Sequence, residues 1–312
     1  MHRRARYVAV MVVVAAMVVG GYLVQRSLTA QNASAASGTT TTRLPSTKFS
    51  AFYLDVGAST SLGFQPTGIV NHNGRRTNTG YANDLLEVEN IKGVSLTLTQ
   101  LGCPGETVQT ILAPAPINHC YTAPETQMTQ SVKFLEARKS EAGLVTIDLG
   151  FNDIRNCLST SPVNQACVNA AIAAVQVDMP RIVKELKVAA GPHVRFVGLE
   201  FENPFLADYL VGSSGPINAT ATLVAMDRFN AALGQAFSRS GVAVANVPAI
   251  FQSDNSTRVS ISNVGVIPEN VYKACQLTWM CYGPPFGPDD HPNDAGYALI
   301  AQAIAAVLPK SW

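Results

Sequence analysis

The chain is poor in charged residues and has no basic surface pattern. Charged residues make up 14% of its 312 residues, whereas apolar residues make up 47%. No stripe of basic residues with interleaved aromatic residues occurs, so a nucleic-acid partner is not expected. An intrinsically disordered chain is also excluded, because this much apolar sequence can bury a sizeable core.

Metal-binding spacings and internal repeats are absent as well. None of the six cysteines forms a Cys-x-x-Cys pair, so a metal site is the weaker interpretation and no cofactor is expected. No repeat is visible, and the composition does not shift again after Lys48. The sequence therefore predicts one domain over residues 49–312.

The N-terminus carries a targeting signal. An apolar run over residues 7–24 follows three arginines, and its length lies between that of a signal-peptide core and that of a spanning helix. Residues 1–35 are therefore predicted to be a signal peptide or an N-terminal membrane anchor, and the polar low-complexity stretch 36–48 a tether. Both alternatives place the domain outside the cytoplasm, either secreted or anchored to the membrane.

The six cysteines predict disulfides, because the compartment of an exported chain is oxidising. Six cysteines allow fifteen pairings, but pairing consecutive cysteines closes three short loops. Each such loop would stabilise the fold by about 2 to 3 kcal/mol. The expected pairs are Cys103 with Cys120, Cys157 with Cys167, and Cys275 with Cys281.

Short apolar, β-rich runs alternate with longer helical patterns after Ser50. This alternation predicts an α/β fold of three layers, with helices on both faces of a flavodoxin-like, five-stranded parallel sheet. The predicted strands are 51–56, 94–101, 144–149, 194–199 and 242–247. The predicted helices are 81–89, 106–112, 128–138, 168–189 with a proline inside, 222–238 and 294–308.

Four polar blocks stand at predicted strand ends or just before a helix. Ser59, Gly105 and Asn152 follow the first three strands, and His291 precedes the last helix. Ligands bind at the carboxyl ends of parallel strands, so the first three are expected at one rim of the sheet. A serine nucleophile, hydrogen-bond donors for an oxyanion and a histidine base are the groups that acyl transfer needs.

Each of these residues alone has a common structural explanation. Ser59 fits a helix N-cap, Gly105 an ordinary turn glycine after a proline, and Asn152 a turn or cap residue. His291 fits a hydrogen-bonded loop histidine. It is their joint occurrence, in this order, that favours a catalytic site.

The four blocks together resemble those of the GDSL or SGNH hydrolase superfamily, whose name lists the serine, glycine, asparagine and histidine of its site. The resemblance runs from about residue 51 to the C-terminus and implies an α/β/α architecture. It also implies that Ser59 is the nucleophile and His291 the general base. The implied oxyanion hole consists of the Ser59 N–H, Gly105 and Asn152.

The turn before the serine departs from the family pattern. The usual Gly-Asp-Ser is Gly57-Ala58-Ser59 here, so a carboxylate that normally supports the nucleophile turn is missing. Asp55, earlier on the same strand, is a candidate substitute. Because the missing aspartate holds none of the four catalytic roles, we expect altered local hydrogen bonding and retained activity.

The acid partner of the histidine is the second departure. The family often places aspartate three residues before the histidine, and that position is Pro288 here. Asp289 is better placed than the adjacent Asp290 to fold back onto Nδ1 of His291, so we expect Asp289 to be the acid. If neither carboxylate reaches the ring, a backbone carbonyl would orient it.

The expected activity is hydrolysis of carboxylic esters by a monomeric esterase or lipase, with a small molecule, a lipid or an acylated glycan as substrate. One alternative is an O-acetylesterase for extracellular polysaccharides. Another is a non-catalytic, surface-tethered carbohydrate-binding module on the same fold. Aromatic residues in the predicted rim loops would either line an acyl pocket or pack within the fold: Phe64, Phe151, Phe201, Phe205, Tyr209 and Phe286.

Overall fold

The structure, a computed structural model, describes residues 48–68, 74–310 and 312. The predicted leader, 1–35, and the predicted tether, 36–48 apart from Lys48, lie outside the described residues. The described residues cover the predicted domain, 49–312, except for 69–73 and 311.

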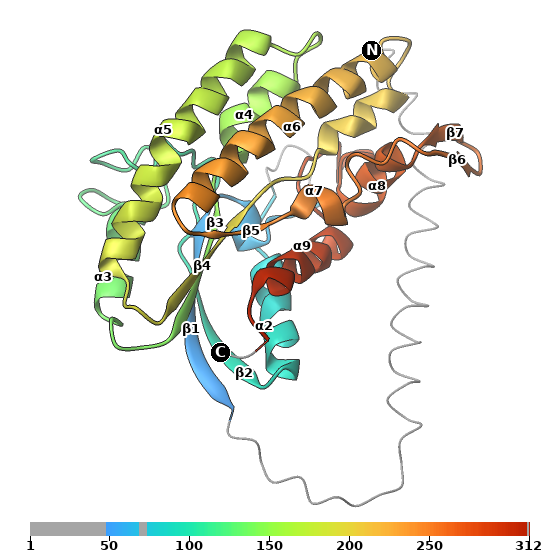
Figure 1. Cartoon of the computed structure of the whole chain (residues 1–312). Coiled ribbons are helices and arrows are strands. Elements are labelled where there is room, and N and C mark those ends of the chain that lie inside the picture. Colours follow the sequence, from blue (N-terminus) through green and yellow to red (C-terminus); the bar gives the residue numbers. More distant parts are fainter. Residues whose placement is uncertain (1–47, 69–73, 311) are drawn as a thin grey trace, which may run out of the picture.

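Five parallel strands form the central sheet, which confirms the predicted α/β fold class (Figure 1). Their order, β2-β1-β3-β4-β5, is that of flavodoxin-like sheets. All four pairings between neighbours are parallel. The strands are β1 (Phe49–Gly57), β2 (Val94–Gln100), β3 (Gly143–Asp148), β4 (Val194–Leu199) and β5 (Ala243–Ala245).

Helices cover both faces of the sheet, and each face has its own core (Figure 1). Successive side chains of a strand point to opposite faces, so Leu54 lies in one core and Tyr53 in the other. The first core lies beneath α3 (Gln127–Glu136), α4 (Phe151–Leu158), α5 (Gln165–Ala189) and α6 (Gly215–Arg239). The second lies beneath α2 (Tyr81–Ile91), α7 (Val247–Ile250) and α9 (Asp294–Val307).

Apolar spacing explains the helices that the sequence predicts well. In α9 the residues at helical spacing, among them Tyr297, Ile300 and Ile304, are fully buried against the sheet. α5 has the length and apolar composition of a membrane span, but its buried face packs against α3, α4 and α6. In this fold α5 is therefore a covering helix, with Pro180 inside it.

One predicted helix is wrong, and several short elements were not predicted. Residues 106–112 form no helix, and 108–112 lie in turns, because Gly105 has a left-handed φ of 82° and the hydroxyls of Thr107 and Thr110 accept from nearby backbone N–H groups. α6 begins before the predicted residue 222, with Pro216 in its first turn. The unpredicted elements include α4, α7, the 3₁₀ segment η2 (Pro204–Leu210), the hairpin of β6 (Arg258–Ile261) and β7 (Gly265–Pro268), and α8 (Glu269–Leu277).

Three disulfides occur among the described residues, and they close the three short loops that the cysteine spacing favours. Disulfides persist in oxidising compartments, so they are typical of an extracytoplasmic protein. Two of them flank candidate site residues, because one loop encloses Gly105 and another begins shortly after Asn152. The pairs are Cys103–Cys120, Cys157–Cys167 and Cys275–Cys281.

The two ends of the described domain meet at the lower edge of the sheet, where β1 begins (Figure 1). The ring centroids of Phe49 and Trp312 lie 6.0 Å apart. The indole N–H of Trp312 donates to Oε2 of the buried Glu89 at 3.0 Å, and the guanidinium of Arg195 lies over the indole. The carboxyl ends of the strands, where the polar blocks lie, are at the opposite edge.

Candidate active site

Ser59 lies in the turn between β1 and a short 3₁₀ segment, η1 (Thr60–Leu62). Ser59 stands at the N-cap position of η1, but its side chain makes no cap hydrogen bond, so capping does not account for the hydroxyl. Its Oγ lies instead 2.8 Å from Nε2 of His291. The carbonyl of Ser59 accepts from Leu62 and Phe64, whereas its own N–H has no hydrogen-bond partner among the described residues.

His291 is held from its other side by Asp289. Oδ1 of Asp289 lies 2.8 Å from Nδ1 of His291 and also accepts the His291 backbone N–H at 3.0 Å. The backbone of Trp279 fixes the same segment, because its carbonyl accepts from Asp289 N–H and its N–H donates to the His291 carbonyl. The structure thus brings Ser59, His291 and Asp289 into one hydrogen-bonded chain.

Charge and burial shift the pKa values of His291 and Asp289 in opposite directions. Burial lowers the pKa of His291, but the hydrogen bond and charge of Asp289, together with the charge of Asp290, outweigh it, and the pKa is raised above 6.5. For Asp289, burial raises the pKa, and the contacts with His291 outweigh burial so that the pKa is lowered. Asp289 therefore remains ionised wherever the imidazole titrates.

Asp290 lies near the histidine ring but pairs with Arg155 of α4. The guanidinium of Arg155 donates to both carboxylate oxygens, Nε to Oδ2 and an Nη to Oδ1 at 3.3 Å. Oδ1 of Asp290 is 3.8 Å from Nδ1 of His291, beyond hydrogen-bond range. Of the alternatives left open by the sequence, Asp289 is thus the group that contacts the ring.

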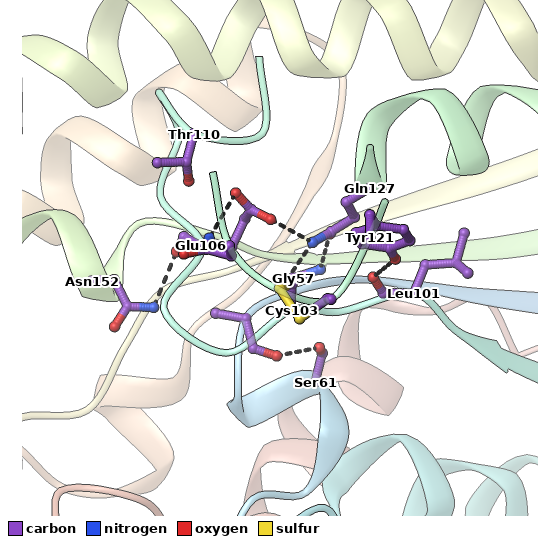
Figure 2. Close-up of a disulfide and its surroundings, with 12 residues drawn as sticks. Gly57, Ser61, Leu101, Cys103, Glu106, Thr110, Tyr121, Gln127 and Asn152 are labelled. Atoms are coloured by element: carbon purple, nitrogen blue, oxygen red, sulfur yellow. Dashed lines mark hydrogen bonds between the residues drawn. A yellow bond between two sulfur atoms is a disulfide. The ribbon is translucent and has the colours of Figure 1, made fainter. Parts of the chain in front are cut away.

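Gly105 stands in the loop after β2, and its φ of 82° is a conformation that favours glycine. Its N–H has no hydrogen-bond partner among the described residues. The loop is fastened to the nucleophile turn, because Cys103 N–H donates to the Gly57 carbonyl at 3.0 Å. The amide of Gln127 bonds both the N–H and the carbonyl of Gly57 (Figure 2).

Asn152 is the second residue of α4, and the helix begins directly after Gly150, whose φ is 129°. Its Nδ2 donates to the Glu106 carbonyl at 3.0 Å, so Asn152 reaches across to the Gly105 loop (Figure 2). A side-chain amide nitrogen carries two hydrogens, and one of them is left for a ligand. The structure thus gathers Ser59, Gly105 and Asn152 at the rim formed by β1, β2 and β3.

Asp148, the last residue of β3, is a site residue that the sequence analysis missed. Its Oδ1 accepts the Ala58 N–H at 2.7 Å. Asp55, the suggested substitute for the missing family aspartate, instead accepts from the hydroxyls of Tyr81 at 2.7 Å and Thr146 at 2.8 Å. The sequence signal for Asp148 was a carboxyl group at the end of a mostly apolar strand.

The six aromatic residues of the predicted rim loops divide into two groups. Phe64 lies 5.6 Å from the ring of His291, and Phe286 is 43% exposed and stacks on Trp279 at 5.8 Å. The other four pack within the fold. Phe201 and Phe205 are in the first core, Phe151 contacts Phe201, and Tyr209 accepts from Arg258.

Comparison with known proteins gives a matching family and a shared fold. A family model described as the GDSL-like Lipase/Acylhydrolase family matches residues 56–299. An extracellular lipase from Streptomyces rimosus is 17% identical, with a TM-score of 0.53, and the match covers 83% of this chain and 100% of the lipase. A phospholipase A1 from Streptomyces albidoflavus NA297 is 18% identical, with a TM-score of 0.51, covering 83% and 99%. A search of curated protein sequences gave no match.

Proposed function

Because the chain belongs to the GDSL-like lipase/acylhydrolase family, we propose that it hydrolyses carboxylic esters through an acyl-enzyme on Ser59. The observation that carries this proposal is the 2.8 Å contact between Ser59 Oγ and His291 Nε2, with Asp289 at the other ring nitrogen. A hydroxyl bonded to an imidazole that a carboxylate orients is the arrangement that activates a serine.

The reaction proceeds in two steps. His291 Nε2 takes the proton of Ser59 Oγ as the oxygen attacks the ester carbonyl carbon. The tetrahedral intermediate then expels the alcohol, which receives that proton from His291, and the acyl group remains on Ser59. Water attacks the acyl-enzyme in the same way, and the acid leaves. Asp289 holds the imidazole in the required tautomer and stabilises its protonated form.

Three donors are proposed to bind the oxyanion. The N–H groups of Ser59 and Gly105 have no partner among the described residues, and Asn152 has one amide hydrogen left after its bond to the Glu106 carbonyl. Donors that are fixed before charge develops lower the barrier without reorganising. The hydrogen bonds that tie the β1, β2 and β3 loops together supply that fixation.

The substrate is proposed to be an ester with an apolar group. Phe286 is exposed and Phe64 lies beside His291, which supports an esterase or lipase over a deacetylase acting on a polysaccharide. A series of p-nitrophenyl esters from acetate to decanoate tests this choice. Rates that rise with acyl length up to at least four carbons favour the apolar site, whereas activity restricted to acetate favours the O-acetylesterase.

The activity itself is tested at Ser59. A fluorophosphonate probe is expected to label Ser59 in the parent, and Ser59→Ala is expected to abolish labelling and ester hydrolysis. Ser213→Ala, at an exposed position before α6, serves as the control and should match the parent. Undiminished hydrolysis by Ser59→Ala would exclude the mechanism, and a parent without label or activity would point to the binding module.

The cellular location and the oligomeric state of the protein are also proposals. We propose that the protein is exported, that residues 7–24 serve as a cleaved signal or a membrane anchor, and that it acts as a monomer. The three disulfides support export.

A further inference from the structure

The turn that carries Ser59 is held from a neighbouring strand. Gly57 and Ala58 have no polar side chain, so the turn has no acceptor of its own for the backbone N–H just before the serine. Asp148 supplies it, through the 2.7 Å bond from Ala58 N–H to Oδ1. Asp148 is 1% exposed, so water does not compete for this bond.

Gly57 leaves the room that Asp148 needs. The two residues are register partners on β1 and β3, and a Cβ on Gly57 would lie 1.9 Å from Oδ1 of Asp148. The φ of Gly57 is not in the left-handed region, so space and not backbone conformation requires the glycine here. The sequence thus pairs a missing side chain on β1 with a carboxyl group on β3.

A second buried carboxyl group lies next to Asp148. Asp55 pairs in register with Thr146, two residues before Asp148 on the same face of β3. Neither carboxyl group forms an ion pair with a described Lys or Arg, and Oδ2 of each has no hydrogen-bond partner among the described residues. Burial and mutual repulsion disfavour the state in which both carboxyl groups are ionised, since neither has an ion-pair partner in the described part of the chain. A state with one proton on the pair is therefore favoured.

The surroundings favour the proton on Asp148. Burial, and after it the charge of Asp55, raises the pKa of Asp148 well above its usual range. Burial raises the pKa of Asp55 to about 7, where hydrogen bonds from Tyr81 and Thr146 limit the rise. The other ionisable groups whose charges act on Asp148 or Asp55 are Glu202 after β4 and Arg76 before α2.

We propose that Asp148 is a positioning residue for Ser59 and that Oδ1 of Asp148 fixes the Ala58 N–H. The bond sets the turn so that Ser59 Oγ meets His291 and the Ser59 N–H faces the bound carbonyl. The inference rests on the proposed ester hydrolysis at Ser59 and adds a residue outside the hydrogen-bonded chain of Ser59, His291 and Asp289.

Two substitutions of Asp148 separate this role from simple core packing. Asparagine has the shape of a protonated aspartate, with an oxygen that accepts and an N–H that replaces the acid O–H. Asp148→Asn is therefore expected to keep kcat and the rate of Ser59 labelling within about threefold of the parent. Asp148→Ala leaves Ala58 N–H without an acceptor, and kcat should fall about ten- to hundredfold with KM within about twofold.

Leu144→Ala is the matched control for lost stability. Leu144 is fully buried on the same strand and the same face as Asp148, but it lies far from the turn. It should lower the melting temperature as much as Asp148→Ala while leaving the labelling rate within about twofold of the parent. If Asp148→Ala does not fold, Asp148→Ser, which is too short to reach Ala58, takes its place.

Hydrogen exchange at the Ala58 amide reports on the turn without any activity. The amide should be protected in the parent and in Asp148→Asn, and exposed in Asp148→Ala. Equal labelling rates in Asp148→Ala and Leu144→Ala, or an Asp148→Asn as slow as Asp148→Ala, would overturn the proposal. Should the parent neither label nor hydrolyse esters while Ala58 protection follows Asp148, the ester hydrolysis fails and the positioning of the turn stands.

Discussion

Asn152 makes one hydrogen bond into the Gly105 loop and has one amide hydrogen left. If that hydrogen binds the oxyanion, Asn152→Ala should lower kcat by about 10²- to 10³-fold, or about 3 kcal/mol, while the protein stays folded. Asn156→Ala, at an exposed position of the same helix, is the control. Steady-state kinetics on a p-nitrophenyl ester measure both, and a kcat for Asn152→Ala within fivefold of the parent would remove Asn152 from the oxyanion hole.

The acid limb of the pH profile reports on Asp289. The hydrogen bond and charge of Asp289 raise the pKa of His291, and the base works only as neutral imidazole. Parent activity should therefore rise with pH through an apparent pKa above 6.5. Asp289→Asn removes the charge of Asp289 and leaves the smaller effect of Asp290, so the limb should move to lower pH while kcat falls. A limb that stays in place in Asp289→Asn would show that another group orients the ring.

The residues of the site differ in how far sequence could reveal them. Asp289 and His291 are two positions apart, so their contact follows from local chain geometry, and Ser59, Gly105 and Asn152 follow strand ends that hydrophobic patterns locate. Asp148 depends on the register between β1 and β3, which no local pattern records. Its contact with Ala58 spans 90 positions of sequence.

At the scale of elements, α4 joins the two halves of the site. Its first turn carries Asn152, and Arg155, one turn later, pairs with Asp290 beside His291. The side chain of Asp290 is 6% exposed, whereas that of Arg155 is 48% exposed. The pair therefore links the helix that carries the candidate oxyanion donor to the residue next to His291.

Arg155→Ala should affect the base in the opposite direction to Asp289→Asn. The charge of Arg155 lowers the pKa of His291, so its loss should raise that pKa and move the acid limb of kcat to higher pH. The buried Asp290 would lose its partner, and the stability should fall by about 1 to 3 kcal/mol. Lys133→Ala, which breaks a more exposed ion pair with Glu125, should do neither. An unmoved limb would mean that Arg155 does not act on His291.

The Cys157–Cys167 disulfide ties the end of α4 to α5. Replacing both cysteines with serine should lower the free energy of unfolding by about 2 to 3 kcal/mol, because the unfolded chain gains freedom. Urea denaturation measures the loss, and Leu144→Ala, at a fully buried position in the core on the other face of the sheet from α4, is the control for lost stability. If the Cys157–Cys167 disulfide also holds α4 in place, Ser59 labelling should slow in the variant that lacks this disulfide and not in the control. Equal labelling rates in the two variants would argue against that role.

The elements were predictable where one pattern dominates. The five strands and the long helices follow from apolar runs and helical spacing. The segment 106–112 was misassigned, because its composition suits a helix while the left-handed Gly105 and the side-chain bonds of Thr107 and Thr110 favour turns. α4 was missed because it is short and begins with Phe-Asn-Asp after a glycine, which is also a turn pattern.

Across the whole molecule, buried acids should make the fold less stable as pH rises. Burial raises the pKa of Asp55, Asp153 and Glu202 to about 7, whereas these groups titrate near 4 in the unfolded chain. Between these values the native state binds more protons than the unfolded state, so stability falls with a slope of up to about 1.4 kcal/mol per pH unit for each group.

Urea denaturation at pH 5 and at pH 8 tests this expectation. The midpoint should be higher at pH 5, and Glu202→Gln should reduce the difference because it removes one of the protons bound by the native state. A midpoint that rises from pH 5 to pH 8 in the parent would contradict it.

The contact between Phe49 and Trp312 also determines on which side the domain would be attached to another molecule or to a surface. Both ends of the domain lie where β1 begins (Figure 1), whereas Ser59 follows the other end of β1. A carrier protein, a resin or a bilayer could be attached at either end. It would therefore hold the domain at the edge of the sheet where β1 begins. The rim that carries the candidate site would then lie at the end of the sheet farthest from that attachment.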